Sequence, residues 1–191
     1  MAHDTKLSRK LSYLLRHGAV KEGIAIDAAG FVAVSDLLEH FNGAYSASDI
    51  RAVVQENDKK RFMLQESDGI LRIRANQGHS MSHIDPDQLL ERIEDPTQVN
   101  VCIHGTYLCH LDSIMKNGLQ RRGRNHIHFA AGEVEDNQVI SGMRTQCEVK
   151  IYIDVEAMIR DGIPLYRSSN NVLLSPGPVP SKYFTQVQKR Q

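Results

Sequence analysis

The stretch "RFMLQESDGILRIRA", residues 61–75, is typical of a β-hairpin, because two runs of strand-forming residues flank a turn at Ser67, Asp68 and Gly69. Toward the N-terminus, apolar periodicity predicts three helices, which we place at residues 4–18, 34–41 and 46–57. Three helices followed by a hairpin outline a winged helix. We therefore predict such a lobe over residues 1–80.

Polar residues at the ends of these helices support their boundaries. Gly18 is expected to end the first helix, because glycine is common just after the last helical turn. The expected N-terminal caps are Asp4 or Thr5, Ser35, and Ser46 or Ser48.

The second half of the chain has a different pattern, in which short strands alternate with short helices. Residues 81–98 are polar and contain proline, which predicts a linker with a short helix in residues 85–93. Strands are expected within residues 99–106, 126–130, 147–155 and 165–175, and helices within 111–119, where Gly118 is expected to end the helix, and 156–162. Residues 147–155 alternate, so Val149, Ile151, Ile153 and Val155 are expected to face inward. This alternation predicts a second lobe over residues 99–191, so the expected fold class is α+β with two lobes.

Composition excludes few function classes. The 41% hydrophobic and 24% charged fractions are typical of a soluble globular protein, and a formal net charge of zero provides no overall field to attract nucleic acid. The three cysteines lack CxxC spacing, which argues against a disulfide framework and a cysteine zinc site. No apolar run is long enough to span a bilayer. We expect a cytoplasmic monomer that does not act at a membrane.

The segment "GRNHIHFA" concentrates nitrogen donors in the second lobe. On a strand, His126 and His128 would point to the same side, and His104 precedes a Gly-Thr turn. One interpretation is a zinc site, although no carboxylate lies near these histidines in the sequence. A second is a network of structural histidines.

A third interpretation of this segment is a site for pyrophosphate and ribose groups. Arg124 and Asn125 are donors, and the glycines of "HGT" and "SGMR" allow the backbone to approach a ligand closely.

The first lobe also contains clustered donors. Arg16 and His17 fall in the last turn of the first predicted helix, where cations commonly compensate the helix dipole. Arg72 and Arg74 share a strand face, and arginines gathered in this way can bind phosphate bidentately. The polar residues that follow are Asn76, Gln77, His79 and Ser80.

Taken in order, these motifs resemble the tRNA 2′-phosphotransferase (RNA 2′-phosphotransferase) family. The motifs that carry the resemblance are "LSYLLRHG", "DKKRF", "IRANQGHS", "HGTY", "GRNHIHFA", "SGMR" and "SNNVLLS". The resemblance extends from Leu7 to Phe184, which is nearly the whole chain.

The resemblance implies an N-terminal winged-helix lobe that binds RNA and a C-terminal, mixed β lobe of the ADP-ribosyltransferase type. It implies NAD-dependent removal of an internal 2′-phosphate from tRNA-like RNA, with no metal required. The phosphate attacks C1″ of the nicotinamide ribose and nicotinamide leaves. The ribose O2″ then attacks the phosphorus of this ADP-ribosylated intermediate, which frees the RNA and ADP-ribose 1″,2″-cyclic phosphate.

The resemblance also implies site residues. The expected catalytic set is Arg16, His17, Arg61 and Arg124, in which the arginines of both lobes neutralise a crowded phosphate and His17 carries a proton. The expected NAD contacts are His104, Gly105, Thr106, Asn125, His126, His128, Gly142 and Arg144. We expect RNA phosphate contacts at Arg74, Asn76, Gln77 and His79.

Three other functions remain compatible with these residues. They are ADP-ribosylation of terminal nucleic-acid phosphates that stops after the first step, a winged-helix regulator that senses NAD, and a zinc hydrolase. Many ADP-ribosyltransferases carry a late glutamate that activates the acceptor, whereas this chain has Val172 and no acidic residue nearby. A phosphate acceptor is already anionic at neutral pH, so the missing carboxylate fits a 2′-phosphate substrate.

Overall fold

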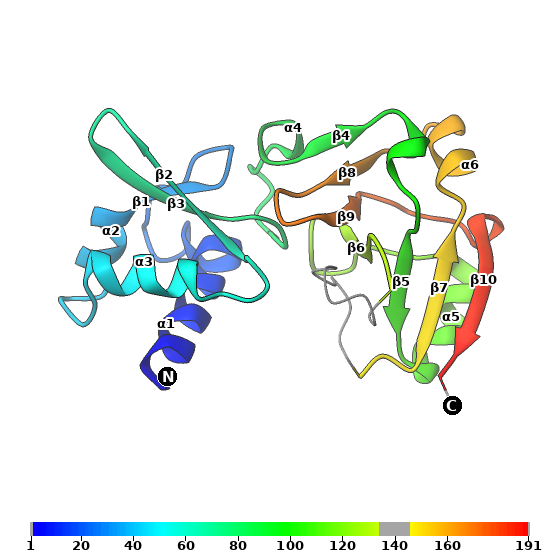
Figure 1. Ribbon diagram of the computed structural model, residues 1–191, viewed down its shortest axis with the longest axis horizontal. Helices are drawn as coiled ribbons and strands as arrows, with labels where there is room; N and C mark the ends of the chain where they lie inside the picture. Colours follow the sequence, from blue (N-terminus) through cyan, green and yellow to red (C-terminus); the bar gives the residue numbers. More distant parts are fainter. Residues whose placement is uncertain (1, 134–145, 191) are drawn as a thin grey trace. The chain divides into compact units, whose positions relative to one another are not determined.

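The computed structural model describes residues 2–133 and 146–190, and the chain divides into two compact units, Met1–Leu89 and Leu90–Gln191 (Figure 1). The first unit has helices and a small antiparallel sheet, and the described part of the second has a seven-stranded sheet with two α-helices. The predicted α+β class is confirmed.

The first unit is built on helix α1 (Ala2–Tyr13), which continues as a π-helical turn over Leu14–Gly18. Four leucines of this segment are buried, and they form its apolar face: Leu7, Leu11, Leu14 and Leu15. Helices α2 (Val34–His40) and α3 (Ala47–Gln55) follow, and strands β1 (Phe31–Ala33), β2 (Phe62–Ser67) and β3 (Ile70–Ala75) form a sheet in the order β1-β3-β2. The short helix α4 (Pro86–Leu89) ends the unit.

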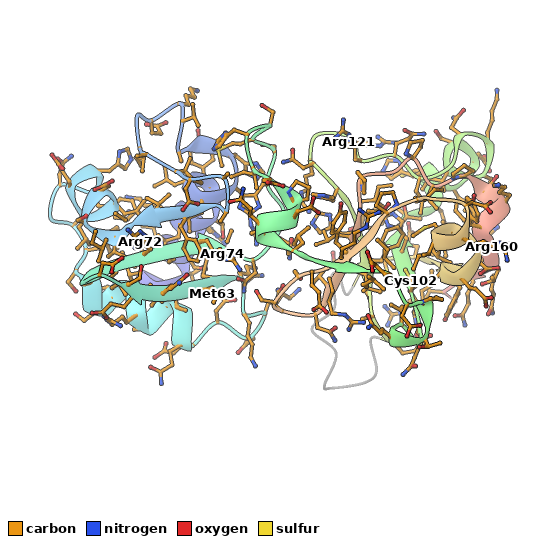
Figure 2. All side chains as sticks on the ribbon, turned by 90° about the horizontal axis from the view of Figure 1, so that it is seen from above. Met63, Arg72, Arg74, Cys102, Arg121 and Arg160 are labelled. Atoms are coloured by element: carbon orange, nitrogen blue, oxygen red, sulfur yellow. The ribbon has the colours of Figure 1, made fainter. Side chains whose placement is uncertain are left out.

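The predicted hairpin is confirmed as β2 and β3. Ser67 pairs with Ile70 across a two-residue loop, and both loop residues have positive φ, 54° at Asp68 and 70° at Gly69. Asp-Gly favours this turn because both residues tolerate the left-handed region. The turn fixes the register of the hairpin. Arg72 and Arg74 lie on its second strand, β3 (Figure 2).

Two of the expected helix starts are wrong. Helix α1 begins at Ala2, so Asp4 and Thr5 lie inside it and not at its start. The helical segment does end at Gly18 as predicted, although the next residue, Ala19, is still right-handed (φ −50°). A Cβ at position 18 would lie 2.5 Å from the ring of the exposed Tyr13, so a larger residue there would require the Tyr13 side chain to move. Ser35 is not a cap, because α2 begins one residue earlier at Val34 and Ala33 precedes it. The Ser46 cap is confirmed, in a reciprocal capping box with Asp49.

The second unit is organised around one sheet with the strand order β10-β7-β5-β6-β9-β8-β4, in which each recorded pairing is antiparallel. This differs from the mixed β lobe that we expected. The strands are β4 (Glu91–Ile93), β5 (Ile103–Thr106), β6 (Ile127–Ala130), β7 (Val149–Ile153), β8 (Leu165–Arg167), β9 (Val172–Ser175) and β10 (Phe184–Lys189).

Helices α5 (Leu108–Asn117) and α6 (Val155–Arg160) share one hydrophobic core with this sheet. Leu111 and Ile114 of α5, Ile151 of β7 and Met158 of α6 belong to it. The alternation predicted for residues 147–155 is confirmed, because Val149, Ile151 and Ile153 of β7 are all buried. Gly118 ends α5 with a φ of 73°, also as predicted.

The segment that we expected to be a linker, residues 81–98, contains the boundary between the two units, which falls between Leu89 and Leu90. Its helix is limited to α4, and Glu91–Ile93 form strand β4, which pairs with β8 at the edge of the sheet. The helical pattern over residues 85–93 therefore ends early, because backbone pairing with β8 determines the conformation of its second half.

Candidate functional site

The turn that carries Arg16 and His17 is held against the segment that follows the hairpin. The Ser80 amide donates a hydrogen bond to the Arg16 carbonyl (2.9 Å), and His17 Nδ1 lies 2.8 Å from Ser80 Oγ. Gly78 (φ 92°) packs on the Arg16 side chain, since a Cβ there would lie 3.4 Å from Arg16 Nε. The structure thus brings together the "LLRHG" and "QGHS" motifs, which are far apart in the sequence.

Arg61 is fixed by a second set of hydrogen bonds in the same unit. Its amide and its Nη1 both donate to Asn57 Oδ1, at 3.1 and 3.5 Å. Asn76 bonds to the other side of the loop: its amide donates to the Arg61 carbonyl (2.8 Å) and its Nδ2 donates to the Lys60 carbonyl (2.6 Å). Asn76 is buried, and its two hydrogen bonds hold the backbone of Lys60 and Arg61 in place.

Arg74 and His79 pack against the segment that leads into β1. The Arg74 guanidinium lies 4.8 Å from the Phe31 ring centroid, and Nη1 donates to the Ala29 carbonyl at 3.4 Å. Burial lowers the pKa of Arg74, and the charge of Asp27 opposes this shift. His79 is buried beside Gly30, where a Cβ would lie 3.1 Å from His79 Nε2.

These contacts give Arg74 and His79 a local packing role, and their contact with RNA phosphate stays a prediction. Gln77 is half-buried in the same segment.

The second unit contains a pocket of about 630 Å³, which is within the usual size range of small-molecule sites. It is bounded by β5, helix α5, the loop over residues 118–126 and β6. Six of the predicted site residues line it, and they are His104, Gly105, Thr106, Arg124, His126 and His128. The structure therefore gathers most of the expected NAD contacts at one place.

Two histidines of this pocket are held in the neutral form. His104 Nδ1 lies 2.9 Å from the His128 carbonyl, and because a carbonyl oxygen only accepts, Nδ1 carries the hydrogen. Burial lowers the pKa of His104, although this hydrogen bond opposes the shift. Burial, with the nearby charge of Arg121, lowers the pKa of His126 to about 4. A neutral His104 leaves Nε2 as an acceptor for a ligand N–H or O–H group.

Positive charge is concentrated on the loop before β6, at the rim of the pocket. Arg121, Arg122 and Arg124 are all exposed, and each lines the pocket (Figure 2 labels Arg121). The Arg124 amide donates to the Arg121 carbonyl (3.2 Å), and Arg122 has a positive φ of 44°. This tight turn presents three guanidinium groups above an interior of neutral histidines.

Several pocket residues were missed by sequence reasoning. His110, Ser113 and Asn117 lie on one face of α5, and Tyr107 and Cys147 also line the pocket. The spacing i, i+3 and i+7 was visible in the sequence, but polar residues at that spacing usually mark a solvent-exposed face.

Three predicted residues cannot be assigned to this pocket. Asn125 is half-buried in the same loop and does not line it. Gly142 and Arg144 lie outside the described residues.

Within residues 2–133 and 146–190, no cluster of three or more His, Cys, Asp or Glu side chains is arranged to hold a metal ion. Over the same ranges, no helix has both the length and the apolar character that crossing a membrane requires. The three cysteines are free thiols, and burial raises the pKa of Cys102.

Comparison with known proteins agrees with the motifs. The profile of the family described as RNA 2′-phosphotransferase, Tpt1/KptA family, matches residues 2–177. Similar relatives include tRNA 2′-phosphotransferase 1 of Danio rerio, 42% identical over 98% of this chain and 87% of the relative. The proteins of the same name from Bos taurus and Homo sapiens are 46% and 45% identical, each over 96% of this chain and 75% of the relative.

The predicted family is thereby confirmed, since the match covers most of the chain and the similarity to these relatives extends over nearly all of it. This chain belongs to the RNA 2′-phosphotransferase (Tpt1/KptA) family of enzymes.

Proposed function

We propose that this enzyme removes an internal 2′-phosphate from RNA of the tRNA splice-junction type, with NAD as the co-substrate. The reaction has two steps, by way of an ADP-ribosylated 2′-phosphate, and releases nicotinamide and ADP-ribose 1″,2″-cyclic phosphate. The observation that carries this proposal is the pocket of the second unit, which combines a cationic rim with neutral histidines and glycine backbone. Family membership supplies the substrate class.

The pocket fits a dinucleotide in size and in donor chemistry. The exposed guanidinium groups of Arg121, Arg122 and Arg124 suit a pyrophosphate, because planar cations bind phosphate oxygens bidentately. His104, as a neutral acceptor, suits a ribose hydroxyl or a carboxamide N–H. We assign the binding of NAD to these residues together with Gly105, Thr106, His126 and His128, and NAD would supply a ribose carbon whose bond to nicotinamide can break.

We assign the chemistry at the phosphate to Arg16, His17, Arg61 and Arg124. A 2′-phosphate and a pyrophosphate are both anionic, and two unit charges about 4 Å apart repel by roughly 4 kcal/mol at an intermediate dielectric. Arginines offset this repulsion and stabilise charge that develops at phosphorus. Arg16 and Arg61 are suited to this role because hydrogen bonds fix the backbone around both of them.

His17 is the proton carrier in this proposal. Its Nδ1 is engaged with the Ser80 hydroxyl, which can accept a hydrogen bond from a protonated ring nitrogen or donate to an unprotonated one. Ser80 can therefore hold the ring in one orientation in both protonation states. His17 would take a proton from the attacking ribose hydroxyl or give one to the departing RNA 2′-oxygen.

The two units divide the work in this proposal. Residues 1–80 form a winged-helix lobe that binds RNA, residues 81–98 connect the lobes, and residues 99–191 form an ADP-ribosyltransferase-like lobe that binds NAD. The protein acts as a cytoplasmic monomer and needs no metal. The β9 region supports a phosphate acceptor, because Val172 and its neighbours supply no carboxylate that could activate a hydroxyl acceptor.

The test is incubation of the protein with NAD and a short, internally 2′-phosphorylated oligoribonucleotide, with every product identified by mass spectrometry. We expect nicotinamide, a 2′-hydroxyl RNA and ADP-ribose 1″,2″-cyclic phosphate in equal amounts. A stable ADP-ribosylated RNA with no cyclic phosphate would overturn the proposal in favour of an ADP-ribosyltransferase that stops after the first step. Activity that is lost with a chelator would instead favour a zinc hydrolase.

A further inference from the structure

The first unit carries a polar groove, and Arg61 is the only one of its lining residues that we assign to the chemistry at the phosphate. The groove has a volume of about 730 Å³ and is lined by α1 and by the loop that joins α3 to β2. Its first wall is a face of α1 on which residues share the spacing i, i+3, i+4 and i+7, namely Thr5, Ser8, Arg9 and Ser12. Its second wall is the loop segment Glu56–Arg61.

Arg61 connects this groove to the residues assigned to the 2′-phosphate. Its side chain lines the groove and is bonded to Asn57, another lining residue. On the opposite wall, Ser12 lies about one turn before Arg16 on the same helical segment. The groove therefore runs away from the proposed catalytic residues along α1.

The groove carries charges of both signs. Arg9, Lys59 and Arg61 can contact phosphate oxygens, and the Ser8 and Ser12 hydroxyls can add neutral donors. Glu56 and Asp58 would repel a polyanion that offered phosphates alone. Ribose 2′-hydroxyls can donate hydrogen bonds to these carboxylates, so the mixture suits a single RNA strand better than DNA.

We infer that this groove binds the RNA strand that flanks the 2′-phosphorylated nucleotide, and that Arg9 contacts a backbone phosphate of that strand. The inference rests on the proposed function, because it takes Arg61 as a contact of the 2′-phosphate. It assigns to the groove the binding of the nucleotides that flank the modified one, which is separate from the chemistry at the modified nucleotide.

The test is equilibrium binding, measured by fluorescence anisotropy with two labelled RNAs: a 2′-phosphorylated dinucleotide, and an octamer with the same modified nucleotide at an internal position. The variants are Arg9→Ala and, as a matched control, Lys6→Ala. Lys6 is an exposed cation on the same helix and does not line the groove. Both changes lie on an exposed helix surface, and thermal melting of each variant checks that the fold is kept.

We expect the wild-type protein to bind the octamer more tightly than the dinucleotide. Arg9→Ala should reduce that advantage by about three- to tenfold and reduce the salt dependence of octamer binding by about one single-strand phosphate contact, a slope change of about 0.7. Lys6→Ala should retain the wild-type advantage. An octamer whose flanking nucleotides are DNA should have a smaller affinity advantage over the dinucleotide than the RNA octamer has.

Equal losses in Arg9→Ala and Lys6→Ala would overturn the inference, because they would indicate a general charge effect. The absence of any octamer advantage in the wild-type protein would also overturn it. Binding requires no turnover, so the two proposals fail separately. An Arg9-dependent octamer advantage without nicotinamide release from NAD would support the groove and contradict the proposed function.

Discussion

In the first unit, hydrogen bonds between segments that are distant in the sequence fix the proposed catalytic residues, whereas in the second unit Arg124 and the residues assigned to NAD line one pocket. Ser80 and Asn76 bond to the turns that carry Arg16 and Arg61. The pocket instead has neutral histidines inside and arginines at its rim.

This difference matches the two ligands that we propose. A phosphate carries concentrated charge, and it is recognised by cations whose positions are fixed in advance. A dinucleotide also offers uncharged ribose and amide groups, which neutral acceptors bind without the cost of burying a second charge. Changes in the first unit should therefore act mainly on the reaction of the phosphate, and changes in the pocket interior should act mainly on NAD.

The largest effect is expected at Arg124, which lines the pocket of the second unit and which we assign to the chemistry at the phosphate. Arg124→Ala should reduce turnover by at least about a thousandfold, because truncating a cation that contacts a desolvated phosphate typically costs several kcal/mol. The measurement is nicotinamide release with a 2′-phosphorylated oligonucleotide. Arg160→Ala, an exposed arginine of α6, is the control and should retain activity. Full activity in Arg124→Ala would remove this residue from the site.

His17→Ala is expected to separate the two steps. Loss of a general acid or base typically costs about a hundredfold or more, and we expect the second step to slow more than the first. The ADP-ribosylated product of the first step should then accumulate in a rapid-quench experiment, while RNA binding stays near the wild-type value. Unchanged turnover without accumulation would contradict the role of His17.

Ser80→Ala should have a smaller effect, because it removes only the hydroxyl that orients the His17 ring. Its backbone bond to the Arg16 carbonyl remains. We expect kcat to fall about tenfold, the size of one net hydrogen bond, with little change in RNA affinity or in Tm. Ser80→Thr should restore the rate, and Ser82→Ala, at an exposed serine nearby, should match the wild type. A loss of Tm that accounts for the whole rate loss would indicate a purely structural role.

The pocket should also make stability depend on pH. An unfolded histidine binds a proton near pH 6.5, whereas His126 in the folded protein has a pKa of about 4. Between these values the unfolded state binds more protons, so the free energy of unfolding decreases as the pH falls through this window. His126→Gln should make Tm less sensitive to pH between 7 and about 4. His83→Gln, at an exposed histidine, should keep the wild-type slope, and the same slope in His126→Gln would contradict a half-buried, neutral His126 ring.

Local signals in the sequence predicted much of the fold. The Asp68-Gly69 turn, the Ser46 cap and the end of α5 at Gly118 each depend on a few adjacent residues, and all three are confirmed. Elements that depend on distant partners were harder to predict. Strand β4 pairs with β8, and strand β10 pairs with β7. A helical or alternating pattern in the sequence reveals neither of these pairings.

The candidate site follows the same rule. Motifs placed His104 and His128 among the expected ligand contacts, and they do line the same pocket. Their neutral state could not be predicted, because it depends on burial and on a hydrogen bond between β5 and β6. The π-helical turn and the bond between His17 and Ser80 likewise need the folded unit.

The division of recognition between the units can be measured most directly by backbone amide NMR of the whole protein, titrated with each ligand alone. The account predicts that NAD shifts the amide signals of Gly105, Thr106 and His128, and that a 2′-phosphorylated dinucleotide shifts those of His17 and Ser80. Shifts at His17 and Ser80 on adding NAD, with none around Gly105, would contradict the assignment of the pocket. A dinucleotide that leaves His17 and Ser80 unmoved would contradict the assignment of the first unit.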